Sequence, residues 1–370
     1  MKVNGTHTRT IWLNDDGWSV AVIDQTSLPH RFTTLRLTSI ADAARAITDM
    51  VVRGAPLIGA TAAYGLALAM RTDPGDDNLE SSARMLLTTR PTAVNLRWVV
   101  DRLHGELKRM PATERSDVAY REAARVCDED VAINHAIGEH GLALLKQLRK
   151  DKGTGPVNVL THCNAGWLAT VDWGTALAPI YMAHDAGIDV HVWVDETRPR
   201  NQGFSLTAWE LDQHGIPFTV VVDTVGGHLM QRGKVDLCIT GTDRTTASGD
   251  VCNKIGTYLK ALAARDNNIP FYVGLPGPSI DWTMNDGIAE IPIEERDPRE
   301  VTSISGLSPS GEMVSIKLTA GECPAANFAF DVTPARLITG LITERGVCPA
   351  TAAGLRSMYP ESGRDQSSTG

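Results

Sequence analysis

The sequence predicts an α/β protein in two parts: a smaller, mainly helical N-terminal domain with a short β-sheet, and a C-terminal domain built on a parallel sheet with helices on both faces. Two patterns predict this fold class. Residues 39–148 carry apolar side chains mostly at helical spacing, whereas residues 157–274 alternate short β-rich apolar runs with helical stretches. Repeated strand–helix–strand units form parallel sheets that helices cover on both faces, so the second pattern indicates such a sheet.

The N-terminal domain is assigned to residues 1–149. Two alternating runs, Thr8–Leu13 and Trp18–Ile23, flank an Asp-Asp-Gly turn and predict a hairpin. Apolar residues then recur at helical spacing in four segments: Ser39–Val51, Pro56–Met70, Thr92–Leu107 and Ser116–Leu148. The second of these segments is almost entirely apolar or small, so we expect it to be a buried helix.

The polar, glycine-rich segment Lys150–Pro156 marks the domain boundary, and residues 150–360 are assigned to the C-terminal domain. Five short strands are predicted there: Val157–Thr161, Val190–Val194, Phe218–Val222, Val235–Thr240 and Pro270–Gly274. Helical stretches separate most of them: Gly166–Ala186, Leu206–His214, Gly227–Arg232 and Lys254–Ala264. The final residues, 361–370, are small and polar and predict a disordered tail.

Composition and short motifs exclude several classes of protein. The chain of 370 residues is 42% hydrophobic, enough for a substantial core, and its net charge of −9 argues against nucleic-acid binding. No apolar run is long enough to span a membrane, and the N-terminus lacks the apolar region of a signal peptide. Neither of the glycine-rich nucleotide-binding motifs occurs, and no H-E-x-x-H is present. We therefore expect no nucleic-acid partner, no membrane contact and no cofactor.

The six cysteines stand singly, and no C-x-x-C pair occurs. This spacing predicts neither a zinc site nor a redox dithiol, so no metal is expected. Reduced thiols in a chain without a secretory signal indicate a cytoplasmic protein.

One cysteine has a chemically favourable position. Cys163 follows the first predicted strand, in the run Thr-His-Cys-Asn-Ala-Gly that is expected to open a helix. The partial positive charge of helix N–H groups favours the thiolate form of a nearby thiol. The alternative is that Cys163 is a small buried packing residue. Neighbours on a strand point to opposite faces, so His162 is not expected to pair with the thiol, and the histidines are interpreted as structural.

Two further strand ends carry polar side chains. The second strand runs into 195–203, where two arginines and Gln202 suit a phosphate or a polyol; the alternative is a solvated loop with internal ion pairs. The fourth strand is followed by Asp243, placed to act as a general acid or base, or else as a helix cap. Asn253 and Lys254 are expected to begin a helix, and a helix N-terminus with a lysine forms an anion site.

The N-terminal domain offers two more anion sites. Arg53, Gly54 and Ala55 precede a proline-opened helix, where glycine lets backbone N–H groups approach an anion. Arg90 likewise stands before a proline. Ordinary capping and turn formation is the alternative for both. One thiol, one carboxylate and several phosphate sites together indicate acid–base chemistry on a small phosphorylated molecule.

Eight segments carry a resemblance to a known family. They are VVRGAPLIGATAAYGLAL (51–68), RPTAVNL (90–96), LTHCNAG (160–166), VWVDETRPRNQG (192–203), LTAWEL (206–211), GTDRTTASGDVCNKIGTY (241–258), IPIEERDPREV (291–301) and FAFDVTPARLITGLITERG (328–346). In these segments the chain resembles the methylthioribose-1-phosphate isomerase family. The same superfamily includes the regulatory subunits of the translation initiation exchange factor.

The resemblance implies an aldose–ketose isomerase of methionine salvage with a Rossmann-like C-terminal domain, no cofactor and a homodimeric assembly. It implies Cys163 and Asp243 as catalytic residues. It implies these substrate-binding residues: Arg53, Gly54, Ala55, Arg90, Gln202, Asn253 and Lys254. We expect Asp243 to protonate the ring oxygen and Cys163 to take the C2 proton. The alternative mechanism is a hydride shift from C2 to C1.

One departure from the family pattern concerns the substrate. The family usually has Gly-Ala-Arg after the glutamine, where this chain has Gly203, Phe204 and Ser205. Because this arginine is missing, the sequence does not determine which group the substrate carries at C5 of the sugar. The alternatives to 5-methylthioribose 1-phosphate are 5-deoxyribose 1-phosphate, ribose 1,5-bisphosphate, and a non-catalytic regulatory role.

Overall fold

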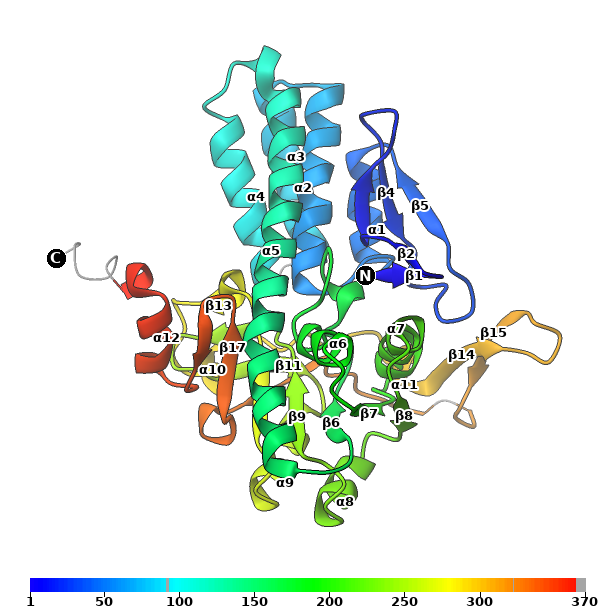
Figure 1. The fold of residues 1–370 in the computed structure, drawn as a ribbon. Coiled ribbons are helices and arrows are strands. Elements are labelled where there is room, and N and C mark those ends of the chain that lie inside the picture. The colour runs from blue at the N-terminus through cyan, green and yellow to red at the C-terminus, as the bar shows by residue number, and fades with distance from the viewer. Residues whose placement is uncertain (91–92, 322, 364–370) are drawn as a thin grey trace.

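The computed structural model describes residues 1–90, 93–321 and 323–363. Figure 1 shows two regions, a group of long helices above and a sheet with its covering helices below. The helices of the upper region are α1 (Ile40–Thr48), α2 (Ala55–Thr72), α3 (Asp76–Thr89), α4 (Val94–Leu107) and α5 (Ala112–Lys152). Beside them lie the strands β1 (Lys2–Val3), β2 (Thr6–His7), β3 (Ile11–Leu13), β4 (Val20–Ile23) and β5 (Thr34–Leu37). The predicted hairpin is confirmed as the antiparallel pair β3–β4, which β5 extends.

Helix α2 forms the centre of the upper region. Almost all of its side chains from Ala55 to Met70 are buried, because α1, α3, α4 and α5 surround it. A helix that is apolar on every side is stable only in such a position. The predicted buried helix over Pro56–Met70 is therefore confirmed. Helix α3, whose sequence is largely polar, had no counterpart in the prediction.

Helix α5 runs through both regions (Figure 1). It packs on α2 in the upper region and on α6 (Ala178–Asp185) in the lower one. The helix ends at Lys152, followed by Gly153 with a positive φ of 78°, a conformation that glycine adopts without strain. The expected connector at Lys150–Pro156 thus begins inside the helix. The division into domains at residue 150 stays a prediction, since α5 belongs to both regions.

The lower region is organised around a seven-stranded sheet with the order β18-β17-β12-β9-β6-β7-β8. Its strands are β6 (Val157–Thr161), β7 (Val190–Asp195), β8 (Phe218–Val221), β9 (Leu237–Thr240), β12 (Phe271–Gly274), β17 (Gly340–Thr343) and β18 (Gly346–Cys348). All neighbours pair in parallel except β18, which forms a hairpin with β17. The five predicted strands are confirmed, and so is the parallel sheet.

The order of the strands places a switch point at β6. From β6 the chain builds outward through β7 and β8, and it then returns to the other side of β6 to build β9 and β12. In open sheets of this kind ligands bind at the carboxyl ends of the strands where the order reverses. The ends of β6 and β9 are therefore the expected position of a site.

Helices cover the sheet, and the remaining strands lie around it. The further helices are α7 (Ala208–His214), α8 (Val225–Gln231), α9 (Thr257–Asp266), α10 (Gly287–Glu290), α11 (Arg299–Thr302) and α12 (Ala352–Met358), with short turns η1 (Trp167–Ala169), η2 (Gly203–Thr207), η3 (Gly277–Ser279), η4 (Ala335–Leu337) and η5 (Pro360–Gly363). A second sheet contains β10 (Arg244–Thr246), β11 (Val251–Lys254), β13 (Ile280–Asp281) and β16 (Phe330–Thr333). The hairpin of β14 (Ser303–Leu307) and β15 (Met313–Lys317) projects to one side (Figure 1).

One expected helix is wrong, and another, expected over Lys254–Ala264, begins later than predicted as α9. The stretch Gly166–Ala186 is not one helix, since only η1 and α6 form within it and a loop joins them. Asn253 and Lys254 do not begin a helix, because they end strand β11, which pairs with β10 and β16. Of the expected tail, residues 361–363 belong to η5, and 364–370 lie outside the described residues. Among the helices that the structure describes, none is both long and apolar enough to cross a membrane.

Candidate active site

A cavity opens at the switch point of the sheet, between the ends of β6 and β9 and the N-terminus of α2. Its lining includes all nine residues that the sequence predicts for the site: Arg53, Gly54, Ala55, Arg90, Cys163, Gln202, Asp243, Asn253 and Lys254. The upper region contributes the first four of these residues, and the lower region contributes the other five. Segments that are far apart in the sequence thus meet in one place.

Cys163 lies in a tight turn directly after β6. Its φ is 62°, a left-handed conformation that costs a residue with a side chain about 1 kcal/mol or more. Two threonines hold it there: the Cys163 N–H donates to Thr197 Oγ1 at 2.8 Å, and Thr207 Oγ1 donates to the Cys163 carbonyl at 2.7 Å. The thiol points to Gln202, with 3.8 Å between Sγ and Oε1. The surrounding structure therefore fixes both the backbone and the thiol.

The helix that was expected to begin behind Cys163 is only the three-residue turn η1, so it supplies no substantial helix dipole. Arg53 binds the turn instead. Its guanidinium donates to the Asn164 side-chain oxygen at 2.5 Å and to the Asn164 carbonyl at 2.7 Å. A residue before α2 is thereby tied to the residue after Cys163.

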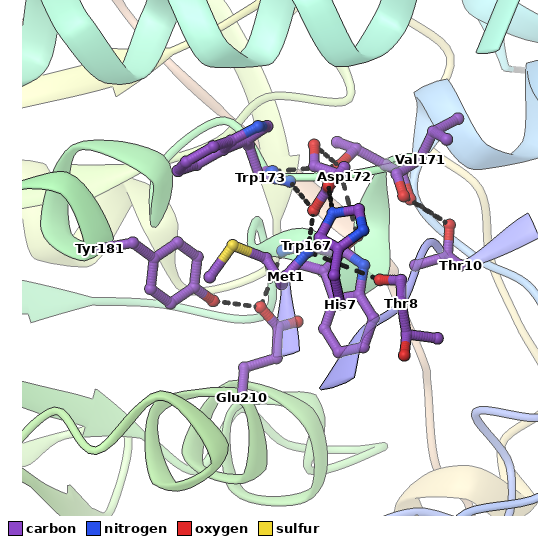
Figure 2. A network of polar contacts seen from close by, with 12 residues as sticks. Met1, His7, Thr8, Thr10, Trp167, Val171, Asp172, Trp173, Tyr181 and Glu210 are labelled. Atoms are coloured by element: carbon purple, nitrogen blue, oxygen red, sulfur yellow. Dashed lines mark hydrogen bonds and ion pairs between the residues drawn. The ribbon is translucent and has the colours of Figure 1, made fainter. Parts of the chain in front are cut away.

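Glu210 supports this turn from below and was missed by sequence reasoning. Its buried carboxylate accepts hydrogen bonds from the N–H groups of Trp167 at 2.7 Å and Leu168 at 2.9 Å, and from Asn164 Nδ2 at 2.8 Å. Figure 2 shows it also receiving the hydroxyl of Tyr181. Burial raises the pKa of Glu210, and these donors act against that rise. The resemblance segment LTAWEL contains Glu210, which was the only available signal.

A second polar cluster lies next to Glu210. Asp172, buried in the loop after η1, receives the N-terminal amine of Met1 and, at 2.7 Å, His7 Nε2 (Figure 2). Thr10 Oγ1 donates to the backbone of the same loop. The first residues of the chain are thereby attached to the loop that follows the Cys163 turn.

Asp243 follows β9 and has different surroundings. Its backbone N–H donates to the Cys252 carbonyl at 2.9 Å, whereas its half-buried carboxyl has no hydrogen-bond or ion-pair partner among the described residues. Burial raises the pKa of Asp243, and the positive charges of Lys254 and Arg53 partly oppose this. A carboxyl group with a raised pKa is suited to give a proton near neutral pH.

Cationic side chains surround the cavity. Arg90 pairs with Glu294 at 3.3 Å, and Lys254 places its Nζ 4.6 Å from the centre of the Phe330 ring. Burial lowers the pKa of Lys254 because its ammonium group is removed from water. Arg53, Arg90 and Lys254 together outweigh the one carboxyl group in the lining, so the cavity is suited to an anion.

The N-terminus of α2 adds to this attraction for anions. Gly54 caps the helix with a φ of 87°, and a Cβ at this position would lie 2.4 Å from the Ala169 carbonyl oxygen. Only glycine fits there. The 18-residue helix directs its free N–H groups and the positive end of its dipole to the cavity.

Part of the lining is apolar and was not predicted. These residues are Ile58, Pro276, Ile291, Pro292 and Phe330. Cys252 and His162 also line the cavity. Burial raises the pKa of Cys252, so its thiol stays protonated and acts as packing. The cavity thus offers apolar as well as cationic surface.

Comparisons with known proteins agree with this geometry. The model of the initiation factor 2 subunit family matches residues 51–350. A methylthioribose-1-phosphate isomerase of Rhodospirillum rubrum is 63% identical over 366 residues, covering 98% of this chain and 94% of that protein. A homologue of the same name from Acidiphilium cryptum is 63% identical over 362 residues and covers 98% of both chains.

Two solved structures share the fold. The crystal structure of 5-methylthioribose 1-phosphate isomerase from Pyrococcus horikoshii OT3 has a TM-score of 0.81 and 38% identity, covering 96% of each chain. The crystal structure of the delta subunit of translation initiation factor eIF-2B from A. fulgidus has a TM-score of 0.78 and 37% identity, covering 96% of this chain and 100% of that one.

Proposed function

This chain belongs to the initiation factor 2 subunit family and, within it, to the methylthioribose-1-phosphate isomerases, and we propose that it converts 5-methylthioribose 1-phosphate to 5-methylthioribulose 1-phosphate in methionine salvage. One observation carries this proposal. Cys163 and Asp243 line the same cavity, beside the N-terminus of α2 and among four cationic side chains, those of Arg53, Arg90, Arg244 and Lys254. A thiol, a carboxyl group with a raised pKa and an anion site are the groups that isomerisation of a sugar phosphate requires.

The two kinds of surface in the cavity fit the two ends of this substrate. Arg53, the N-terminus of α2, Arg90 and Lys254 supply positive charge for the phosphate. The apolar lining residues, such as Ile291 and Phe330, suit an uncharged methylthio group. Ser205, next to Phe204, stands where the family usually has an arginine, and the loss of that cation disfavours a second phosphate at C5.

In the proposed mechanism Asp243 acts first. The phosphate at C1 prevents the furanose from opening by simple mutarotation, so ring cleavage requires a proton on the ring oxygen. Asp243 in its acid form gives that proton. Cys163 as thiolate then takes the C2 proton, and the resulting enol-type intermediate is reprotonated at C1. Gln202, in contact with the thiol, orients it.

The alternative mechanism is a hydride shift from C2 to C1, with Cys163 polarising the substrate instead of removing a proton. Turnover in deuterium oxide separates the two routes. Deuterium at C1 of the ketose supports proton transfer, and complete retention of protium supports the hydride shift.

A substrate panel tests the proposed function. Purified protein is given 5-methylthioribose 1-phosphate, 5-deoxyribose 1-phosphate and ribose 1,5-bisphosphate, and ketose formation is followed by NMR. We expect a strong preference for the methylthio sugar. A preference for either other sugar would keep the chemistry and change the pathway. The likeness to the eIF-2B delta subunit makes a regulatory role the second candidate, and absence of turnover with all three sugars would favour it.

We propose further that the protein acts as a homodimer in the cytoplasm. The homodimer rests on the family resemblance, and sedimentation or light scattering of the purified protein tests it. The location is supported by the cysteines: all six are free, as expected of a reducing compartment.

A further inference from the structure

A buried charged cluster lies directly beneath the cavity and takes no part in the proposed chemistry. Its centre is His162, which precedes Cys163 and is almost completely buried. His162 Nδ1 lies 3.0 Å from Asp195 Oδ2, and His162 Nε2 lies 2.8 Å from the Ile255 carbonyl oxygen. Lys260 Nζ, from α9, lies 3.0 Å from the same Asp195 oxygen.

These contacts determine which ring nitrogens carry protons. A carbonyl oxygen only accepts hydrogen bonds, so Nε2 must carry a proton to donate to Ile255. The Asp195 oxygen next to Nδ1 is also 3.0 Å from an ammonium group, which stabilises the carboxylate form and disfavours a proton on that oxygen. Nδ1 then carries a proton as well, and the imidazole is a cation.

The charges around the ring agree with this assignment. Asp195 and Lys260 are joined by two further carboxylates. Asp331 accepts hydrogen bonds from the Gly256 N–H at 2.7 Å and the Tyr258 N–H at 3.1 Å, and Asp223 has an oxygen within 4.8 Å of the His162 and Asp195 ligand atoms. Three carboxylates face one lysine, so a second cation reduces the excess of buried negative charge.

A metal ion does not explain the cluster. His162, Asp195 and Asp223 are spaced closely enough for one. However, Lys260 already lies on the Asp195 oxygen that faces His162, and both oxygens of Asp223 accept backbone hydrogen bonds, from the Thr197 and Arg198 N–H groups. These oxygens already have partners, and Asp195 Oδ1 is the one carboxylate oxygen of Asp195 and Asp223 without a hydrogen-bond partner among the described residues.

We propose that His162 is a positioning residue that donates hydrogen bonds from both ring nitrogens and so ties the Cys163 turn to the Lys254 segment. It is one residue from Cys163 at the end of β6, and its Nε2 proton holds the Ile255 carbonyl, one residue after Lys254 at the end of β11. A Cβ at Gly256 would lie 3.2 Å from the ring, so the loop packs directly on the imidazole. The two segments cannot move apart while this bond is made.

The protonation state is tested without any substrate. In protein labelled with [15N]histidine, the His162 ring signals, assigned by their loss in His162→Gln, are expected to show both nitrogens protonated at pH 7. A single protonated nitrogen at that pH would overturn the proposal, because it would mean a neutral imidazole.

The positioning role is tested by kinetics, and only this arm rests on the proposed isomerase function. Glutamine keeps one N–H donor and removes the charge and the second donor. His162→Gln is expected to lower kcat about 10- to 100-fold, with KM for the sugar phosphate changed less than about threefold. The matched control His191→Gln, at a half-buried histidine on β7 far from the cavity, is expected to leave both constants unchanged. Normal kcat in a folded His162→Gln protein would overturn the positioning role. If the wild-type protein turns over no sugar, the proposed function fails while the NMR result still stands.

Discussion

Cys163 and Asp243 each follow a strand of the same sheet, yet their surroundings differ. The Cys163 turn is held in a left-handed conformation by a hydrogen bond that it donates to Thr197 and by hydrogen bonds that it accepts from Thr207 and Arg53. The Asp243 carboxyl has no such partner among the described residues, and burial against nearby positive charge sets its protonation. The comparison teaches that one group is specified by geometry and the other by electrostatics.

The largest expected effect comes from removing the proton of Asp243. Asp243→Asn keeps the size of the side chain but cannot protonate the ring oxygen, so kcat is expected to fall about 100-fold or more without loss of folding. Steady-state kinetics and thermal unfolding measure the two quantities. The exposed Asp117→Asn serves as the control. Turnover close to that of the wild type would remove Asp243 from the mechanism.

The protonation of Asp243 is also expected to determine how the turnover rate falls at alkaline pH. Because burial raises the pKa of Asp243, its acid form persists to higher pH than that of an exposed aspartate. The rate is expected to decline as pH rises through this raised pKa. A profile flat from pH 5 to pH 9 would contradict an acid role.

Cys163→Ala removes the second proposed catalytic group, the thiol. The backbone bonds of the turn remain, while the thiol that contacts Gln202 is lost. We expect kcat to fall about 100-fold or more with unfolding unchanged to within about 1 kcal/mol. Cys323→Ala, at the one exposed cysteine, is the matched control. A fully active Cys163→Ala protein would contradict both mechanisms.

Glu210→Gln tests whether geometry is what matters at Cys163. The Glu210 carboxylate accepts four hydrogen bonds. In Glu210→Gln the side-chain nitrogen replaces one of the accepting oxygens, so at least one donor would lose its acceptor. We expect a loss of roughly 1–3 kcal/mol of unfolding free energy and a fall in kcat of about 10-fold. Denaturant unfolding and kinetics check both, against the exposed Glu312→Gln. Lower stability with unchanged kcat would mean that the turn tolerates a weaker support.

The smallest effect concerns a buried carboxyl away from the cavity. Burial raises the pKa of Asp130 to about 7, so its neutral form is favoured in the folded protein. The stability that this form provides is complete below the unfolded pKa near 4 and is lost as pH rises through about 7. Asp130→Asn, which stays neutral, is therefore expected to gain about 1–3 kcal/mol of stability relative to wild type between pH 4 and pH 8.

Unfolding at the two pH values measures this difference. The neighbouring Asp128→Asn, on the exposed side of α5, is expected to show no such change between them. A stability difference between Asp130→Asn and wild type that stays the same at pH 4 and pH 8 would mean that Asp130 ionises in the folded protein without cost.

The sequence was informative where a local pattern determines the structure. The short β-rich runs predicted the strands, and Cys163 and Asp243 were found because each directly follows one. Glu210 and Thr207 could not be found in this way, since their partners are more than 40 residues away and only the folded chain brings them together.

Short elements caused the errors. Asn253 and Lys254 read as a helix start, but β11 is a strand only because β10 and β16 lie on either side of it. The residues were identified correctly as lining the site, whereas the reason was wrong: their position comes from the second sheet and not from a helix dipole. His162 was interpreted as structural because neighbours on a strand point to opposite faces, and its contacts with Asp195 and Ile255 could not be read from the sequence because they come from other elements.

Helix α5 has a consequence for how a substrate reaches the cavity. At 41 residues it is about 60 Å long and packs on both regions. The wall that carries Arg53 and Arg90 and the wall that carries Cys163 and Asp243 are therefore joined by one rigid rod. A hinge rotation between them would have to bend that rod or strip it from α2 or α6. Packing of α5 on both regions thus holds the proposed phosphate site and the proposed catalytic residues at a fixed separation, so the proposed substrate would enter a cavity of preset width.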